Sequence, residues 1–297
     1  MRLKGKVAVI TGGASGIGEA SAKLFVENGA QVVIADIQDD HGNRLAQSLA
    51  PNACFFHCDV SKETDVSALV DYALEKHGRL DIVFSNAGIP GGLFSSMADV
   101  TLEDLERVIS VNVRGAYLCT KHAARVMIGA KTRGSILLTS SMASVMAMPN
   151  GPSYTASKHA VLGIMKSAAT DLAPHGIRVN CVSPAGVSTP MLIDAMKKSF
   201  PSFDKHCADE MLETTMELKG LTLEADDVAK SALFLCSDDA RYISGHNLVI
   251  DGAFTSCKAF STANSMDFLP IKSFFDRLAP ASSKKIQSEM NGQLAPQ

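Results

Sequence analysis

The sequence lacks three features that would each point to a class of protein: a paired cysteine motif, a long hydrophobic run and an excess of basic residues. Its seven cysteines are scattered over 297 residues without a Cys-x-x-Cys pair, which favours a reducing compartment over a disulfide framework. The formal net charge is −3, so nothing indicates attraction to nucleic acid or to an anionic membrane. The first apolar run, residues 7–10, is too short for a signal peptide or a membrane span, and the cytoplasm is the expected location.

One close group of metal-ligating residue types occurs, formed by Cys54, His57 and Cys58. Packing of these side chains as buried or half-buried residues of one strand is favoured over metal binding. No metal is therefore predicted.

The length fits one large α/β domain or two small ones, and a composition of 46% hydrophobic and 20% charged residues is that of a globular protein. Short apolar strands alternate with amphipathic helical patterns. This alternation predicts a single doubly wound parallel sheet, flanked by helices on both faces, with ligands at the carboxyl ends of the strands. The predicted strands are residues 7–11, 31–35, 54–58, 80–85, 134–139, 178–182 and 247–250. The predicted helices reach residue 26 after the first strand and then cover 39–49, 62–77, 102–120 and onward, 153–173 and 224–235.

The first predicted strand runs directly into Gly12-Gly13-Ala14-Ser15-Gly16-Ile17-Gly18 and then a helix. In this context glycines bind a dinucleotide phosphate: Gly12 allows a tight turn, and Gly16 and Gly18 let backbone and helix approach the pyrophosphate. The amides at the helix start face its negative charge. A plain turn is the alternative, because the spacing differs from the commoner Gly-x-Gly-x-x-Gly.

The second predicted strand is followed by Asp36. An acidic residue at this position accepts hydrogen bonds from the adenosine ribose hydroxyls and repels a 2′-phosphate. No Arg or Lys follows until Arg44, so the sequence favours NAD over NADP. A solvated Asp at a strand end is the alternative.

Further polar or small residues follow the next strands: Asp59-Val60, Asn86-Ala87-Gly88 and Ser140-Ser141. They are expected at the same edge of the sheet, where the small Ala87 and Gly88 would let a cofactor lie close to the backbone. Asn112 lies within a predicted helix, where Asn is unfavourable. It is either a satisfied core residue or part of a site.

Tyr154 and Lys158 are four residues apart in a predicted helix and therefore share one face. A phenol ionises near pH ~10, and a neighbouring ammonium group lowers that pKa toward neutrality. In isolation, such a pair is more often an exposed Tyr and a solvated Lys on a surface helix. Its interpretation as a proton-transfer pair depends on what the rest of the chain places around it.

Residues 191–221 form a long connection rich in Met, Leu and Phe. The segment is either a lid over a hydrophobic substrate or two short packed helices. Residues 260–297 are predicted to be a C-terminal tail, with a short helix over 271–278 and disorder in the last ~15 residues.

Together these residues resemble the short-chain dehydrogenase/reductase family over residues 1–257. The resemblance rests on residues 11–18, 86–88, Asn112, Ser141 and the pair Tyr154-x-x-x-Lys158, and it continues through 178–180, 184–189 and 249–252. Segments 154–191 and 240–252 are similar to the plant specialised-metabolism branch, which includes borneol, secoisolariciresinol and xanthoxin dehydrogenases. Three departures, Ser85, Ala185 and Ala253, replace residues frequent in the family without touching the chemistry.

The resemblance implies a Rossmann-type NAD-binding dehydrogenase domain over residues 1–259, with 191–221 as the lid and a catalytic tetrad of Asn112, Ser141, Tyr154 and Lys158. Asp59 and Val60 would flank the adenine, and Val187 and Thr189 would hold the nicotinamide carboxamide. The implied cofactor contacts are Gly12, Ser15, Gly16, Ile17, Gly18, Asp36, Ile37, Asp59, Val60, Asn86, Ala87, Gly88, Tyr154, Lys158, Pro184, Val187 and Thr189.

The activity that this implies is NAD-dependent oxidation of a secondary alcohol to a ketone. Tyr154 would accept the hydroxyl proton, Ser141 would hydrogen-bond the same oxygen, and Asn112 would hold a water that extends the proton path. Lys158 would lower the pKa of Tyr154 and bond the nicotinamide ribose.

Residues 145–148 and the Met-rich segment predict an apolar pocket, with a terpenoid alcohol such as borneol as the leading candidate. Lignan, sesquiterpenoid or steroid-like alcohols, the carbonyl reductase direction, and a non-catalytic NAD(H)-sensing protein are the alternatives. A homo-tetramer or dimer is implied by the family. The small-residue face of Ala160, Gly163, Ile164 and Ala168 fits either a subunit contact or an internal core.

Overall fold

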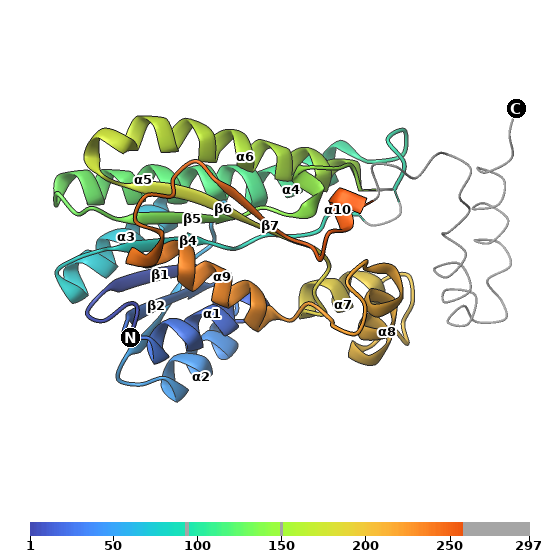
Figure 1. Cartoon of the computed structure of the whole chain (residues 1–297), viewed down its shortest axis with the longest axis horizontal. Coiled ribbons are helices and arrows are strands. Elements are labelled where there is room, and N and C mark those ends of the chain that lie inside the picture. The colour runs from blue at the N-terminus through green and yellow to red at the C-terminus, as the bar shows by residue number, and fades with distance from the viewer. Residues whose placement is uncertain (93–94, 149–150, 258–297) are drawn as a thin grey trace, which may run out of the picture.

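The computed structural model describes residues 1–92, 95–148 and 151–257. Within them seven strands form one sheet in the order β3-β2-β1-β4-β5-β6-β7 (Figure 1), and all neighbouring strands are parallel. The predicted fold class is confirmed. The strand order reverses between β1 and β4, the topological switch point where such sheets bind ligands. The strands are β1 Val7–Thr11, β2 Gln31–Asp36, β3 Ala53–His57, β4 Ile82–Ser85, β5 Ser135–Thr139, β6 Arg178–Pro184 and β7 Asn247–Ile250.

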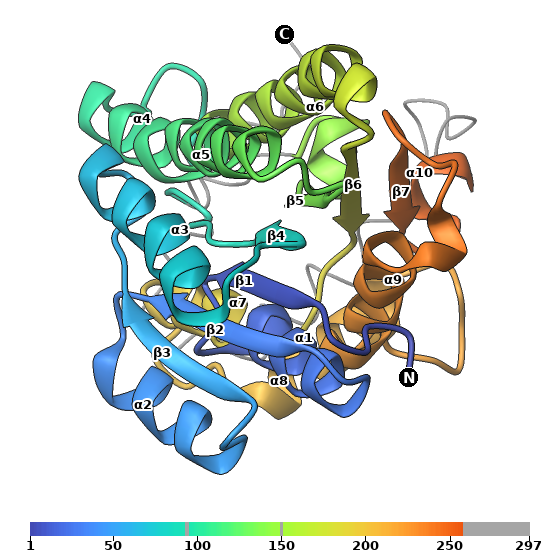
Figure 2. The ribbon, with the colours of Figure 1, turned by 90° about the vertical axis from the view of Figure 1, so that its left-hand side faces the viewer.

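Helices cover both faces of the sheet (Figure 2). Helices α1, α2 and α9 pack on one face, and α3, α5 and α6 pack on the other. Along β1, Val7 and Val9 face the second layer while Ala8 and Ile10 face the first, because successive strand side chains point to opposite faces. The helices are α1 Gly16–Glu27, α2 Asp39–Ser48, α3 Glu63–His77, α4 Leu102–Ile109, α5 Gly115–Gly129, α6 Pro152–Leu172, α7 Pro190–Lys197, α8 Lys205–Thr215, α9 Ala225–Cys236 and α10 Phe254–Cys257, with short 3₁₀ turns at Met142–Ser144, Ala173–His175 and Asp238–Ala240.

The long helix predicted from residue 102 is not regular. It is divided into α4 and α5 by a π-helical turn, η1 (Ser110–Arg114), which contains Asn112. A π-turn adds a residue to the helix and occurs often at functional sites. Apolar periodicity cannot reveal it, because the hydrophobic face continues on both sides of the turn.

The long connection at residues 191–221 contains α7 and α8, which lie together beyond the end of the sheet (Figure 1). They enclose a small core of their own around Met196, Phe203 and Ala208, separate from the two cores of the sheet. The alternative of two short packed helices therefore describes the segment's structure.

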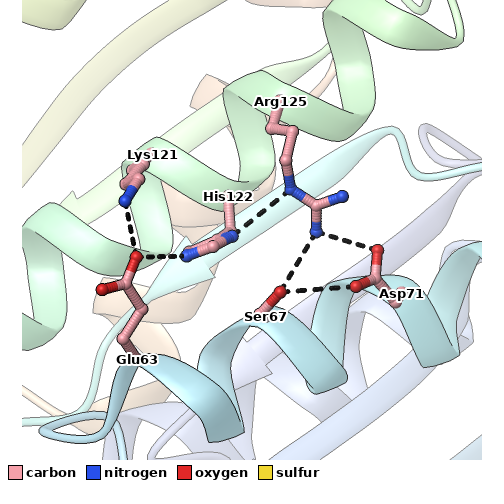
Figure 3. Close-up of polar contacts among 6 residues, drawn as sticks. All are labelled: Glu63, Ser67, Asp71, Lys121, His122 and Arg125. Carbon is pink, nitrogen blue, oxygen red and sulfur yellow. Dashed lines mark hydrogen bonds and ion pairs between the residues drawn. The ribbon is translucent and has the colours of Figure 1, made fainter.

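Helices α3 and α5 are joined at the surface by polar side chains (Figure 3). Nε2 of the buried His122 lies 3.2 Å from Oε1 of Glu63, and Arg125 donates from Nε to His122 Nδ1 at 3.4 Å. Arg125 also donates to Oδ1 of Asp71 at 2.8 Å. Exposed ion pairs of this kind contribute little to stability.

Of the cysteine–histidine group, Cys54 is half-buried and Cys58 buried, as predicted, whereas His57 is exposed. His57 Nδ1 lies 2.7 Å from Oδ1 of Asp39 at the start of α2. In the described ranges, no three His, Cys, Asp or Glu side chains are arranged to hold a metal ion.

Among the helices of residues 1–92, 95–148 and 151–257, none has both the length and the apolar character needed to cross a membrane. The predicted tail, residues 260–297, with its short helix over 271–278, lies outside the described residues.

Asp81, just before β4, is the buried polar group that fixes the start of the central strands. Its carboxylate accepts from the Val7 amide at 2.9 Å and from Arg79 at 2.8 and 2.6 Å. We expect Asp81→Ala to lower the free energy of unfolding by about 2–3 kcal/mol, because the buried amide and the guanidinium lose their acceptor. Asp71→Ala, which removes an exposed partner of Arg125, should cost about 1 kcal/mol or less. Urea denaturation of both variants checks this, and equal losses would contradict it.

Candidate active site

The glycine-rich turn after β1 is packed too closely to accept side chains. Gly12 and Gly16 have φ of +60° and +54°, a conformation that glycine adopts readily. A Cβ on Gly18 would lie 2.0 Å from the Gly12 carbonyl oxygen, and one on Gly12 would lie 2.8 Å from Cα of Ala87. The following helix begins at Gly16, after an extended Ser15 whose hydroxyl makes no capping bond. The first amides of any helix have no intrahelical acceptor, and here the Ser15 side chain does not cap them. They therefore remain available to a pyrophosphate.

Asp36 is 5% exposed, so it is not a solvated residue at a strand end. Its Oδ2 accepts from the Ala14 amide at 3.0 Å. Its Oδ1 accepts from the backbone and side-chain nitrogens of Gln38 at 3.1 and 3.2 Å. The carboxylate is thus fixed against the glycine turn, while the neighbouring Ile37 is 63% exposed.

Asp59 and Val60 follow β3. Asp59 accepts from the amide and the hydroxyl of Ser61 at 3.0 and 2.7 Å. Burial raises the pKa of Asp59, but these bonds and Lys62 outweigh burial, and the pKa is lowered. Val60 is buried against Gly115, where a Cβ would lie 2.8 Å from Val60 Cγ2.

The segment after β4 joins the glycine turn to the residues of the predicted tetrad. Asn86 Nδ2 donates to the carbonyls of Thr11 and Gly12, both at 3.2 Å, and Oδ1 accepts from the Thr139 hydroxyl at 3.1 Å. A Cβ on Gly88 would lie 3.4 Å from Lys158 Nζ. Asn86 and Gly88 therefore lie between the candidate cofactor turn and Lys158.

Tyr154 and Lys158 lie in the first two turns of α6, beside Ser141 at the end of β5. Lys158 is 4% exposed, its Nζ lies 5.5 Å from the centroid of the Tyr154 ring, and it donates to the carbonyl of Thr139 at 2.9 Å. Ser141 hydrogen-bonds Tyr154 and accepts from the Ala143 amide at 3.2 Å. An exposed Tyr with a solvated Lys is excluded by this burial.

Burial moves the pKa values of this pair in opposite directions. It raises the pKa of Tyr154, while the hydrogen bond with Ser141 lowers it. It lowers the pKa of Lys158 to about 8. Both shifts follow because a buried site disfavours the charged form of each group. Burial therefore acts against the charge of each residue, and the prediction that the pKa of Tyr154 is lowered toward neutrality is wrong for this structure, because burial outweighs the lowering by Ser141.

Asn112 is buried, and both the oxygen and the nitrogen of its side-chain amide form hydrogen bonds within the chain. Its Oδ1 accepts from the Ile89 amide at 2.8 Å, and its Nδ2 donates to the Ile89 carbonyl at 2.9 Å and to the Ser157 hydroxyl at 3.0 Å. A Cβ on Gly88 would lie 3.3 Å from Oδ1. Asn112 is thus a satisfied core residue that also borders the site.

The segment after β6 closes over the glycine turn. Val187 is buried, and the Thr189 amide donates to its carbonyl at 2.7 Å. A Cβ on Gly16 would lie 3.1 Å from Thr189 Cγ2. Pro184, which ends β6, belongs to the same edge.

Three neighbours of the site were not predicted as site residues: Thr139, Ser140 and Ser157. Thr139 acts through its carbonyl, Ser140 donates to the Lys158 carbonyl at 2.9 Å, and Ser157 accepts from Asn112. No sequence pattern marks a backbone acceptor. Ser140 directly precedes Ser141, and Ser157 directly precedes Lys158. This adjacency to predicted site residues is the one feature of the sequence that points to them.

The fold and this site together define a Rossmann-type dinucleotide-binding protein. The family model described as enoyl-(acyl carrier protein) reductase matches residues 12–255. Momilactone A synthase from Oryza sativa subsp. japonica is 51% identical over 256 residues, covering 86% of this chain and 91% of that protein. (+)-Borneol dehydrogenase 1 from Salvia officinalis is 49% identical over 256 residues, covering 86% and 95%. The solved structure of 3-ketoacyl-(acyl-carrier-protein) reductase from Brucella melitensis, complexed with NADH, has a TM-score of 0.76 and 36% identity, covering 85% of this chain and 99% of that one.

This chain belongs to the short-chain dehydrogenase/reductase family. It is an alcohol dehydrogenase of that family with a nicotinamide cofactor, NAD or NADP. Its similarity to plant enzymes of specialised metabolism confirms the branch that the sequence indicated.

The lowered pKa of Lys158 predicts how stability depends on pH. The unfolded chain keeps this proton up to about pH 10.5, whereas the folded chain loses it near pH 8. Between these values the unfolded state binds more protons, so the free energy of unfolding should rise with pH, by up to about 3 kcal/mol. We expect the difference in unfolding free energy between wild type and Lys158→Met to grow across this window. Urea denaturation at several pH values checks it, and a constant difference would contradict the shift.

Proposed function

We propose that the protein oxidises an apolar secondary alcohol to a ketone with NAD⁺, using Tyr154 as the proton acceptor. The observation that supports this most is the pairing of Tyr154 with Ser141 beside the buried Lys158, at the same sheet edge as the glycine turn. A surface Tyr-Lys pair has none of these partners.

The residues present fit a dinucleotide. A Cβ at Gly12 or Gly18 would clash with the backbone, so the turn keeps its tight form, and no Ser15 side-chain cap occupies the first amides of α1, which suits them to bind a phosphate. When bound, the cofactor supplies a nicotinamide ring that takes a hydride from the carbinol carbon. The protein supplies binding, orientation and proton transfer.

Tyr154 and Lys158 divide the proton chemistry. The Tyr154 oxygen takes the proton of the substrate hydroxyl, which requires the phenolate. Burial opposes that form, and the ammonium charge of Lys158 favours it. Because the pKa of Lys158 is lowered to about 8, its charge is present at neutral pH and is lost in mildly alkaline solution.

Ser141 and Asn112 have supporting roles. The hydroxyl of Ser141 lies on the Tyr154 side of the site, where it donates to the substrate oxygen as the carbonyl forms. Asn112 holds the backbone of Ile89 with both polar ends of its amide. The water expected beside Asn112 would meet only the remaining lone pair of Oδ1.

We propose NAD rather than NADP because the carboxylate of Asp36 is fixed beside Ala14, where it would repel a 2′-phosphate. Comparison of kcat/KM for NAD⁺ and NADP⁺ tests this. We expect a preference for NAD⁺ of at least about tenfold, which Asp36→Ala reduces by removing the repelling charge. A wild-type preference for NADP⁺ would show that Asp36 does not select the cofactor.

The substrate proposed is a terpenoid alcohol such as borneol. Two observations support an apolar substrate: Val145, close after Ser141, and Met191, close after Thr189, are 45% and 41% exposed. The name of the Salvia officinalis relative supports borneol itself. Lignan, sesquiterpenoid and steroid-like alcohols fit the same apolar character. Reduction of a ketone is the second candidate function, favoured by the reductase from Brucella melitensis.

We further propose a homo-oligomer in which α5 and α6 face another subunit. Tyr117 on α5 is 59% exposed, and a Cβ on Gly163 of α6 would meet no atom within 4 Å. The mass in solution, measured by light scattering, tests this against a monomer.

Activity of Tyr154→Phe tests the proposed function. Wild type should form NADH with apolar secondary alcohols, and the variant should lose turnover by about 10²-fold or more, because no group replaces the proton acceptor. NAD⁺ binding should be unchanged, since the ring is retained. A variant that keeps the wild-type rate would contradict the mechanism. Wild type that binds NAD⁺ but oxidises none of the alcohols would favour a non-catalytic NAD(H) sensor.

A further inference from the structure

The 3₁₀ turn that follows Ser141 is connected to the last two strands of the sheet by side-chain hydroxyls. Ser144, which ends this turn, donates from Oγ to the Ser141 carbonyl at 2.6 Å. Its Oγ also lies 3.3 Å from Oγ of Ser183 on β6. Ser183 Oγ in turn lies 2.6 Å from Oδ1 of Asn247, the first residue of β7. A continuous row of polar groups therefore connects β7 to the backbone of Ser141.

The two serines in the middle of this row are closed to solvent. Ser183 is fully buried and Ser144 is 4% exposed, while Asn247 is half-buried. A buried hydroxyl without a partner is unfavourable. The serines therefore depend on one another and on Asn247 for their hydrogen bonds.

A count of protons shows which way the row is directed. Each hydroxyl carries one proton, and an amide oxygen carries none. With the oxygen of the Asn247 amide toward Ser183, Ser183 and Ser144 both use their protons at the ends of the row. No proton then remains for the contact between the two serines.

A half-turn of the Asn247 amide, which hardly changes its shape, supplies the missing proton. Nδ2 then donates to Ser183, Ser183 donates to Ser144, and Ser144 donates to the carbonyl of Ser141. This arrangement alone gives each of the three contacts a proton. Hydrogen bonds in such a chain also strengthen one another.

The end of the row orients both the backbone and the side chain of Ser141. The Ser141 carbonyl accepts from the Ser144 amide at 2.9 Å as well as from its hydroxyl. Ser141 Oγ accepts from the Ala143 amide at 3.2 Å, within the same turn. A shift of the turn would therefore redirect the hydroxyl of Ser141.

We propose that Asn247 is a positioning residue which, through Ser183 and Ser144, holds the turn so that the Ser141 hydroxyl faces the substrate oxygen. The row of contacts stands on its own geometry, and its effect on the rate rests on the proposed function. A misdirected hydroxyl loses its bond to the oxygen whose charge changes during the reaction. The consequence therefore falls on the reaction itself and not on cofactor binding.

Steady-state kinetics of Ser183→Ala and Asn247→Leu test the effect on the rate. Both variants should lower kcat and kcat/KM for the alcohol equally, by about 5–10-fold, because the weakened bond belongs to the transition state. KM for NAD⁺ should be unchanged. Ser135→Ala is the matched control, since it removes a buried hydroxyl at the other end of β5. Its kcat should be that of the wild type.

Two further variants separate positioning from a general weakening of the fold. In a Ser141→Ala background, Ser183→Ala should cause no additional loss of kcat, because the row acts through Ser141. Asn247→Asp tests the direction of the row, since a carboxylate accepts hydrogen bonds but does not donate them. It should lose as much activity as Asn247→Leu, and wild-type activity of Asn247→Asp would overturn the donor role of Asn247.

Hydrogen exchange of the amides of residues 143–146, measured without NAD⁺, gives a readout that needs no turnover. These amides donate within the turn and just after it. Ser183→Ala and Asn247→Leu should speed their exchange by about threefold or more, because the turn opens more readily. Ser135→Ala should leave it unchanged.

The proposal is overturned if exchange at residues 143–146 does not respond to Ser183→Ala. It is also overturned if Ser183→Ala lowers kcat as strongly without Ser141 as with it. Failure of the proposed function looks different: the wild type would then oxidise none of the alcohols. Faster exchange of the turn in Ser183→Ala and Asn247→Leu would still support the positioning of Ser141 by the row.

Discussion

The side-chain amide of Asn86 sets the spacing on which the rest of the site depends. Its nitrogen donates to the carbonyls of Thr11 and Gly12 at the end of β1, and its oxygen accepts from Thr139 at the end of β5. The carbonyl of Thr139 in turn accepts from Lys158. A parallel sheet brings these strand ends to one edge, and the amide fixes the distance between the glycine turn and Lys158.

Desolvation is the second constraint, and it acts on Tyr154 and Lys158 in opposite directions. Burial raises the pKa of the phenol and lowers the pKa of the ammonium group to about 8, so at neutral pH Tyr154 is protonated and Lys158 keeps its charge. In the same low-dielectric site, a charge on Lys158 acts strongly on the phenol. Burial thus disfavours the phenolate form of Tyr154, and it also strengthens the interaction of the Lys158 charge with that phenolate. The proposed acid–base role depends on the second effect outweighing the first.

The sequence predicted the sheet well because each strand is a short apolar run bounded by a turn. All seven predicted strands begin and end within two residues of the observed ones, and Asp36, Asn86 and Ser141 lie at one edge as expected. Two kinds of feature were not predictable. The π-turn around Asn112 leaves the apolar pattern intact, and the acceptor for Lys158 is a backbone carbonyl, which no residue type identifies.

The segment at residues 191–221 shows where sequence reasoning reached its limit. Its apolar residues fitted a lid or two packed helices equally well, because both bury the same side chains. The structure shows two helices with a small core of their own. Their contact with the cofactor-side segment depends on Gly186, where the absence of a side chain admits Leu212. Such a contact can be seen only once both segments have been placed.

The central claim is that this sheet edge directs hydrogen transfer from an alcohol carbon to a bound nicotinamide. Mass spectrometry of the reduced cofactor tests it directly, after reaction of the protein and NAD⁺ with borneol deuterated at the carbinol carbon. The account predicts that the reduced cofactor carries the deuterium, because the carbinol hydrogen moves directly to the nicotinamide ring. A reduced cofactor that carries hydrogen from solvent instead would contradict it.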